Sequence, residues 1–150
     1  MQVQNGMTIG PAFATVRELV LKHGRRYKPR MLPKGRWARS LGLCYANALR
    51  AAKSGRYVYV EGYAIALGTG GLAQLHAWLT DPQNPSVAYD PTWGYGTEYF
   101  GIPLRLDHVM KMRKEAGRPG VLDAWEMGWP LVSGEHRIED VIWTAGSDVR

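Results

Sequence analysis

The chain contains a single cysteine, Cys44, which is followed along the sequence by His76 and Asp90. Residues of these three types can together perform nucleophilic catalysis: a thiolate attacks an acyl carbon, an imidazole moves the proton, and a carboxylate fixes the tautomer of that imidazole. We therefore take Cys44 as the candidate nucleophile, His76 as the base and Asp90 as the orienting acid. Taken singly, each residue also has a structural explanation, as a small buried hydrophobe, a core histidine or a turn former.

The predicted elements around these residues would bring them together. The segment 44–53 is rich in good helix formers and predicts a helix that begins at the cysteine. There the helix dipole and free N–H groups favour a thiolate and can bind an oxyanion. His76 lies in a predicted strand over 74–80 and Asp90 ends another over 87–90, so a hairpin would make them neighbours.

The rest of the chain predicts further helices and strands with loops between them. We expect helices over 11–23, 104–116 and about 133–143, a half-buried strand over 56–66, and loops over 25–43 and 91–103. At 150 residues and 45% hydrophobic content, the chain can bury one core, so we expect a single domain over 1–150.

One cysteine excludes an internal disulfide, and one Cys with four His offers no cluster with zinc-ligand spacing. We therefore expect no metal. The sequence contains neither a signal-peptide pattern nor an apolar stretch of membrane-spanning length, so we expect no membrane association and a cytoplasmic location.

Two short motifs strengthen the catalytic interpretation. His76 lies in HAWL and Asp90 in DPTW, and EGYA at 61–64 lies between the cysteine and the histidine. This arrangement resembles the transglutaminase-like superfamily of the papain-like fold, where the pattern is Cys, then HxW, then DxT. The resemblance implies an α+β fold with a catalytic helix packed on an antiparallel β-sheet and flanking helices, and it assigns Cys44, His76 and Asp90 their three roles. The whole chain also resembles short proteins of phage genomes.

The resemblance implies a cysteine-dependent acyl-transfer enzyme acting on a peptide, protein or other amide. If water releases the acyl group, the enzyme is a hydrolase such as a peptidase, amidase or deamidase; if an amine does so, it is a transglutaminase. The proposed triad supplies nucleophile, base and orienting group by itself, so no cofactor is implied.

Papain-like proteases have a glutamine oxyanion donor shortly before the cysteine, and SLGLC contains none. The candidates for a second donor beside the Cys44 N–H are Trp37, Ser40 and Asn47. The candidates for the substrate cleft are Trp78, Trp93, Tyr95 and Tyr99. Glu61, if buried, would need a partner, and we expect one of the upstream arginines.

Positive charge is concentrated near the N-terminus, where residues 1–39 hold nine Lys or Arg and one acid, Glu18. Such a segment is most often a solvated connector. The alternative function is a non-catalytic binding module that engages nucleic acid or an acidic protein through residues 22–39. The side chains concerned are Arg25, Arg26, Lys28, Arg30, Lys34 and Arg36.

Overall fold

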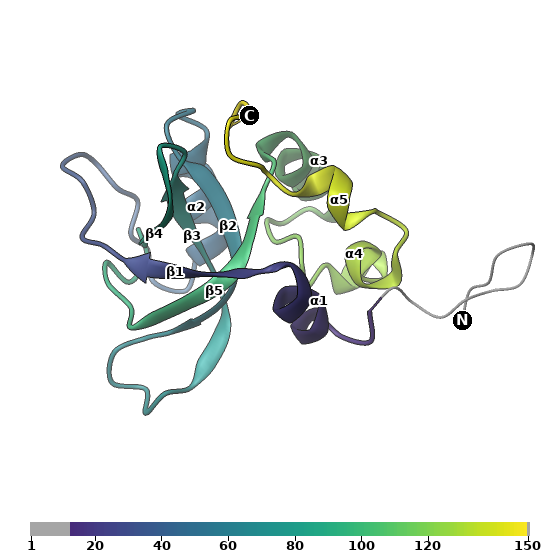
Figure 1. The fold of residues 1–150 in the computed structure, drawn as a ribbon, viewed down its shortest axis with the longest axis horizontal. Helices are drawn as coiled ribbons and strands as arrows, with labels where there is room; N and C mark the ends of the chain where they lie inside the picture. Colours follow the sequence, from purple (N-terminus) through teal and green to yellow (C-terminus); the bar gives the residue numbers. More distant parts are fainter. Residues whose placement is uncertain (1–12, 150) are drawn as a thin grey trace, which may run out of the picture.

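A closed barrel of five strands forms the centre of the protein, seen in a computed structural model that describes residues 13–149 (Figure 1). The strands are β1 (Arg25–Pro29), β2 (Val58–Ile65), β3 (Ala73–Asp81), β4 (Asn84–Tyr89) and β5 (Glu98–Leu104). Their order around the barrel is β1-β4-β3-β2-β5, with β5 pairing back to β1. Every neighbouring pair is antiparallel except β1 and β4, which run parallel.

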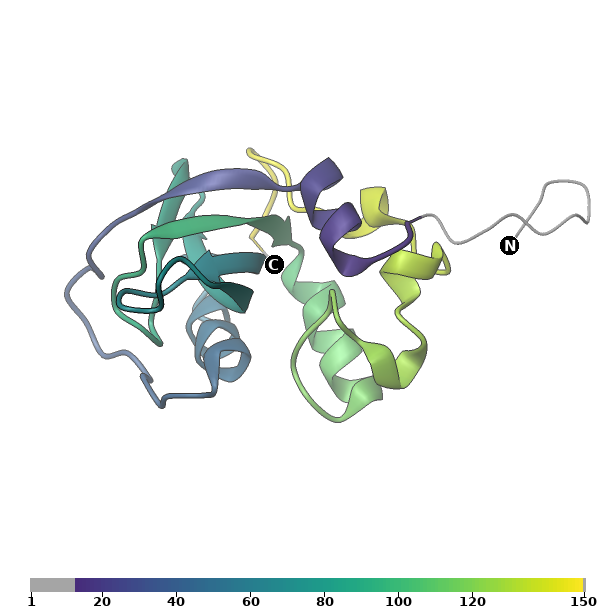
Figure 2. The ribbon, with the colours of Figure 1, turned by 90° about the horizontal axis from the view of Figure 1, so that it is seen from below.

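The helices divide into two groups around this barrel. They are α1 (Val16–His23), α2 (Cys44–Ala52), α3 (Leu106–Ala116), α4 (Pro130–Ser133) and α5 (Ile138–Val141), with a short 3-10 turn η1 (Trp125–Met127). Figure 1 shows α1, α3, α4 and α5 together on one side, whereas α2 packs on β2 and β3. In Figure 2 the chain after β1 forms a long loop that leads into α2.

The alternation of side chains along each strand creates two separate cores. Tyr59, Ala77 and Leu79 point to the outer face, where they pack with Ala48 and Leu49 of α2 in the larger core. A second, smaller core fills the barrel interior and consists of Tyr27, Val60, Ala64, Trp78, Ala88 and Tyr99. The barrel interior is therefore a packed core.

Two glycines allow the central strands to approach closely. Gly62 of β2 is paired with Gly101 of β5 and, on its other side, with His76 of β3. A Cβ atom at Gly62 would overlap the backbone of Gly101, and one at Gly101 would overlap the Trp78 ring. The EGYA motif thus contains a residue whose lack of a side chain brings β2 and β5 together.

Several predicted elements are confirmed, and others were wrong. The helix that begins at Cys44, the strands over 56–66 and 74–80 and the helix over 104–116 match α2, β2, β3 and α3 within a few residues. The predicted loops over 25–43 and 91–103 each contain a barrel strand, β1 and β5. Charged residues and glycines are uncommon in strands, so they favoured a loop in both segments. Both strands pair with partners that lie far away in the sequence.

The predicted terminal helices are shorter than expected. Residues 11 and 12 of the first predicted helix lie outside the described residues, and α1 begins at Val16 because the Thr15 side chain caps it. The single helix expected over 133–143 is replaced by the last residue of α4 and the whole of α5, since Gly134, in a left-handed conformation, ends α4. Between residues 13 and 149, no helix is long and apolar enough to cross a membrane.

Candidate active site

Cys44 is the first residue of α2 and is partly exposed to solvent. The residue before it, Leu43, makes no side-chain capping hydrogen bond. The first intrahelical bond runs from the Asn47 N–H to the Leu43 carbonyl at 2.9 Å, so the N–H groups of residues 44–46 precede it. This end of the helix therefore offers backbone donors and partial positive charge at the thiol.

His76 lies on β3 with only 2% of its surface exposed. Its Nε2 is 2.8 Å from Oδ2 of Asp90, which leaves Nδ1 as the ring nitrogen for the Cys44 thiol. Burial lowers the pKa of His76, but hydrogen bonding and charge interactions with Asp90 and Cys44 outweigh it and raise the pKa to about 9. The imidazolium is thus stabilised from both sides.

Asp90 is held by hydrogen bonds to both carboxylate oxygens. Oδ2 accepts from the Tyr99 hydroxyl at 2.7 Å as well as facing His76. Oδ1 accepts from the backbone N–H groups of Thr92 at 2.9 Å and Trp93 at 3.0 Å. Burial opposes ionisation of the carboxyl, but hydrogen bonds from His76, Tyr99 and Trp93 hold its pKa below the usual value. Asp90 therefore presents a fixed, ionised oxygen to the imidazole.

Two further residues, Trp93 and Asn47, support His76 and the turn that carries Asp90. The indole of Trp93 stacks on the His76 ring, with centroids 3.7 Å apart and planes 15° apart. The Asn47 amide group donates to the Thr92 hydroxyl at 2.8 Å and to the Ser40 carbonyl at 2.9 Å. Asn47 therefore ties α2 to the turn that carries Asp90, and its partner Thr92 is 45 positions away in the sequence.

The structure leaves one of the three side chains predicted as oxyanion donors free to act. Both amide hydrogens of Asn47 are occupied, and the indole N–H of Trp37 donates to the Pro33 carbonyl at 3.0 Å. Ser40 is exposed, and within residues 13–149 its hydroxyl has no hydrogen-bond partner. Its carbonyl accepts from Asn47 and Leu43, which keeps Ser40 close to the start of α2.

The four predicted cleft residues occupy different places. Trp78 is completely buried in the barrel, and Tyr99 is 1% exposed with its hydroxyl on Asp90, so neither lines a cleft. The barrel closes over that face of the sheet, which the strand pattern alone did not indicate. Trp93 packs on the His76 imidazole, and Tyr95 is 44% exposed, so of the four residues it is the one most accessible to a molecule in solvent.

Glu61 has a structural role, but the expected arginine ion pair was wrong. Its carboxylate accepts hydrogen bonds from the Tyr59 hydroxyl at 2.7 Å, from Val121 N–H at 2.8 and 3.0 Å, and from Leu122 N–H at 3.0 Å. Burial raises the pKa of Glu61, and these hydrogen bonds oppose that rise. Glu61 thereby anchors the segment before η1 to the barrel, next to Tyr45 of α2.

We expect Glu61→Ala to destabilise the protein by roughly 3–5 kcal/mol, because two buried N–H groups and one hydroxyl lose their acceptor. The free energy of unfolding in urea measures this effect. Glu115→Ala, an exposed acid on α3, is the control and should stay close to wild type. Equal stability of the Glu61 and Glu115 variants would contradict the role of Glu61 as an anchor.

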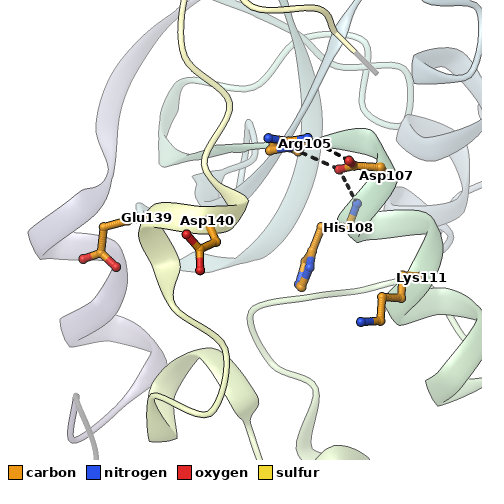
Figure 3. A pocket seen from close by; sticks show the side chains of 6 residues that line it. All are labelled: Arg105, Asp107, His108, Lys111, Glu139 and Asp140. Atoms are coloured by element: carbon orange, nitrogen blue, oxygen red, sulfur yellow. Dashed lines mark hydrogen bonds and ion pairs between the residues drawn. The ribbon is translucent and has the colours of Figure 1, made fainter.

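A cavity of about 530 Å³ lies away from the triad, between α3 and α5 (Figure 3). In this view His108 and Asp140 project into the space, whereas Glu139 points away from it. The His108 ring meets the His136 ring edge to face at 5.3 Å, and each ring has a buried nitrogen without a partner in the described part of the chain. Burial, and then His136 and Lys111, lower the pKa of His108 to about 4.

This shift predicts a contribution of His108 to acid unfolding. The folded protein binds this proton less readily than the unfolded chain, so stability present above pH 6.5 is lost as the pH falls towards about 4. We expect the unfolding free energy of His108→Gln to fall less than that of wild type over this range. His23→Gln serves as the control, and parallel curves for His108→Gln and wild type would refute the prediction.

The sequence did not predict the roles that three residues have near the site. Tyr99 supports Asp90, Thr92 accepts from Asn47, and Tyr45 lies beside Cys44 with its pKa raised by burial and by the Glu61 and Cys44 charges. The alternation of EYFGIPL over 98–104 is a strand signal that could have indicated an inward-facing Tyr99. Thr92 belongs to the DxT motif, but nothing local indicates its hydrogen bond to Asn47, and nothing local marks Tyr45.

Comparison with protein-family models, with curated proteins and with solved structures found no match. Among the described residues, no group of three or more His, Cys, Asp or Glu side chains is placed to hold a metal ion.

Proposed function

We propose that this protein is a cysteine-dependent acyl-transfer enzyme whose site is of the transglutaminase-like, papain-like type. Cys44 is the nucleophile, His76 the general base and acid, and Asp90 the orienting group. The observation that carries the proposal is the buried pair of His76 and Asp90, in which the carboxylate is hydrogen-bonded on both oxygens, with the partly exposed Cys44 thiol close enough to the imidazole to help raise its pKa. A turn-forming Asp needs only the backbone bonds to Oδ1, whereas Oδ2 of this residue faces His76 and Tyr99.

In the reaction, the Cys44 thiolate forms a bond to the acyl carbon, and its carbonyl oxygen becomes an oxyanion next to the N–H groups at the start of α2. The carbon–nitrogen bond then breaks while His76 gives its proton to the leaving amine. The acyl group remains on Cys44 as a thioester. Water or a second amine gives a proton to His76 and attacks the thioester, which releases the thiolate.

The test is to incubate the protein with peptides that carry glutamine side chains and ordinary peptide bonds, with and without a labelled primary amine. We expect mass spectrometry to find an acyl adduct on Cys44 that hydroxylamine removes, and Cys44→Ala to form none. Labelled product would indicate transfer to the amine, and unlabelled acid would indicate hydrolysis. The proposal fails if wild type forms no adduct with these amides and its thiol reacts at the rate of an ordinary cysteine.

A further inference from the structure

A groove follows the exposed face of the catalytic helix. It consists of two adjoining hollows of about 270 and 360 Å³, which share Ala38, Asn47 and Arg50. We call the union of these two hollows the α2 groove. One hollow extends between the 34–38 segment and the end of α2, and the other continues along α2 to Arg113 of α3.

The lining of the α2 groove is basic and contains no acid. Six cations contribute to it: Lys34, Arg36, Arg50, Lys53, Arg56 and Arg113. All six are exposed, and within the described residues none forms an ion pair. Outside the groove, Arg26, Arg105, Arg118 and Arg137 have carboxylate partners, whereas Arg17, Arg25, Arg30 and Arg39 form no ion pair within the described residues. Unpaired cations concentrated in one groove repel each other and attract a polyanion.

Aromatic side chains in the groove favour one kind of polyanion. Trp37 and Tyr57 line the first hollow beside Arg36 and Arg56, and their rings lie 5.4 Å apart at 49°. Nucleobases stack on such rings while arginine and lysine contact the phosphates, a combination that an acidic peptide does not require. A duplex hides the faces of its bases, whereas a single strand exposes them.

We infer that the α2 groove binds single-stranded nucleic acid, with phosphates on its cations and a base against Trp37 or Tyr57. This binding differs from catalysis, because Cys44, His76 and Asp90 do not line the groove. The position of the groove also determines which of the basic residues predicted from the sequence can contact the nucleic acid. Of the six predicted to engage an anion, Lys34 and Arg36 line the groove, whereas Arg25, Arg26, Lys28 and Arg30 do not.

The test is fluorescence anisotropy with a labelled single-stranded oligonucleotide of about 12 nucleotides, at several salt concentrations. We expect Arg50→Glu/Arg56→Glu to bind at least about tenfold more weakly and to reduce the salt slope by about 1.4, or about 0.7 for each lost phosphate contact. The control, Arg17→Glu/Lys22→Glu on α1, changes the net charge equally and should keep most of the affinity. If the first variant does not fold, Lys53→Glu/Arg113→Glu takes its place.

Two competitors decide the class of partner. An unlabelled single strand should displace the probe at lower concentration than a duplex or a polyglutamate peptide of equal charge. Equal weakening in the groove and control variants, or displacement by polyglutamate at the same concentration, would overturn the inference. Cys44→Ala should bind the oligonucleotide like wild type, so failure of the proposed enzyme and failure of this binding site would be distinguishable.

Discussion

Cys44 is expected to react with iodoacetamide near pH 6 roughly 10- to 100-fold faster than an ordinary thiol. An imidazolium beside the thiol favours the thiolate, which is the form that iodoacetamide alkylates. The lower nucleophilicity of a stabilised thiolate cancels part of that gain. As the chain contains one cysteine, the alkylation rate reports on Cys44 alone.

His76→Gln should remove most of this advantage, because it keeps a side chain of similar size but no titratable ring. Since the pKa of His76 is raised to about 9, the wild-type and variant rates should converge as the pH rises past that value. His23→Gln on α1 is the matched control and should react like wild type. Identical rate profiles for wild type and His76→Gln would show that the imidazole does not activate the thiol.

Asp90→Asn should lower acyl-transfer activity by roughly two to four orders of magnitude while the fold persists. The asparagine oxygen can keep the two backbone hydrogen bonds that hold the turn at Thr92 and Trp93. Its amide group would then face Nε2 of His76, so that nitrogen must accept a hydrogen bond and the ring proton moves to Nδ1. The imidazole then faces Cys44 in the wrong tautomer and cannot act as its base.

This prediction can be measured without knowledge of the substrate. Long-range proton–nitrogen NMR of labelled histidine distinguishes the Nδ1–H from the Nε2–H form, and alkylation near pH 6 reports on the thiol. Asp107→Asn, an exposed acid on α3, is the control and should change neither readout. If Asp90→Asn unfolds the protein but leaves the His76 tautomer of the remaining folded molecules unchanged, Asp90 is a turn former and not part of a triad.

The local parts of the site were visible in the sequence because they depend on neighbours along the chain. Helix propensity predicts that a helix begins at Cys44, and the apolar runs on either side of the predicted turn over 81–86 predict the two strands that carry His76 and Asp90. An aspartate directly before a proline is typical of a turn, so the sequence also predicts a turn at Asp90. Such patterns depend on fewer than about ten neighbouring residues, so they can be recognised in the sequence without knowledge of the fold.

Closure of the barrel was decided by tertiary structure, because pairing energy comes from distant strands. β1 pairs with β4 and β5, so a charged segment becomes a strand once Tyr27 enters the barrel and its neighbours face water. Alternation shows that a strand has two faces, but it does not say which face the molecule covers. Trp78 and Tyr99 were therefore taken for cleft residues, although both lie inside the barrel.

The supports of the site likewise depend on contacts that no short motif records. Glu61 is held by backbone N–H groups 60 and 61 positions away, and Asn47 reaches Thr92 across 45 positions. A buried carboxylate must find donors, but backbone and arginine donors satisfy it equally well on chemical grounds. The residue types determine what chemistry Cys44, His76 and Asp90 can do, and the packing of α2 on the barrel decides that they meet.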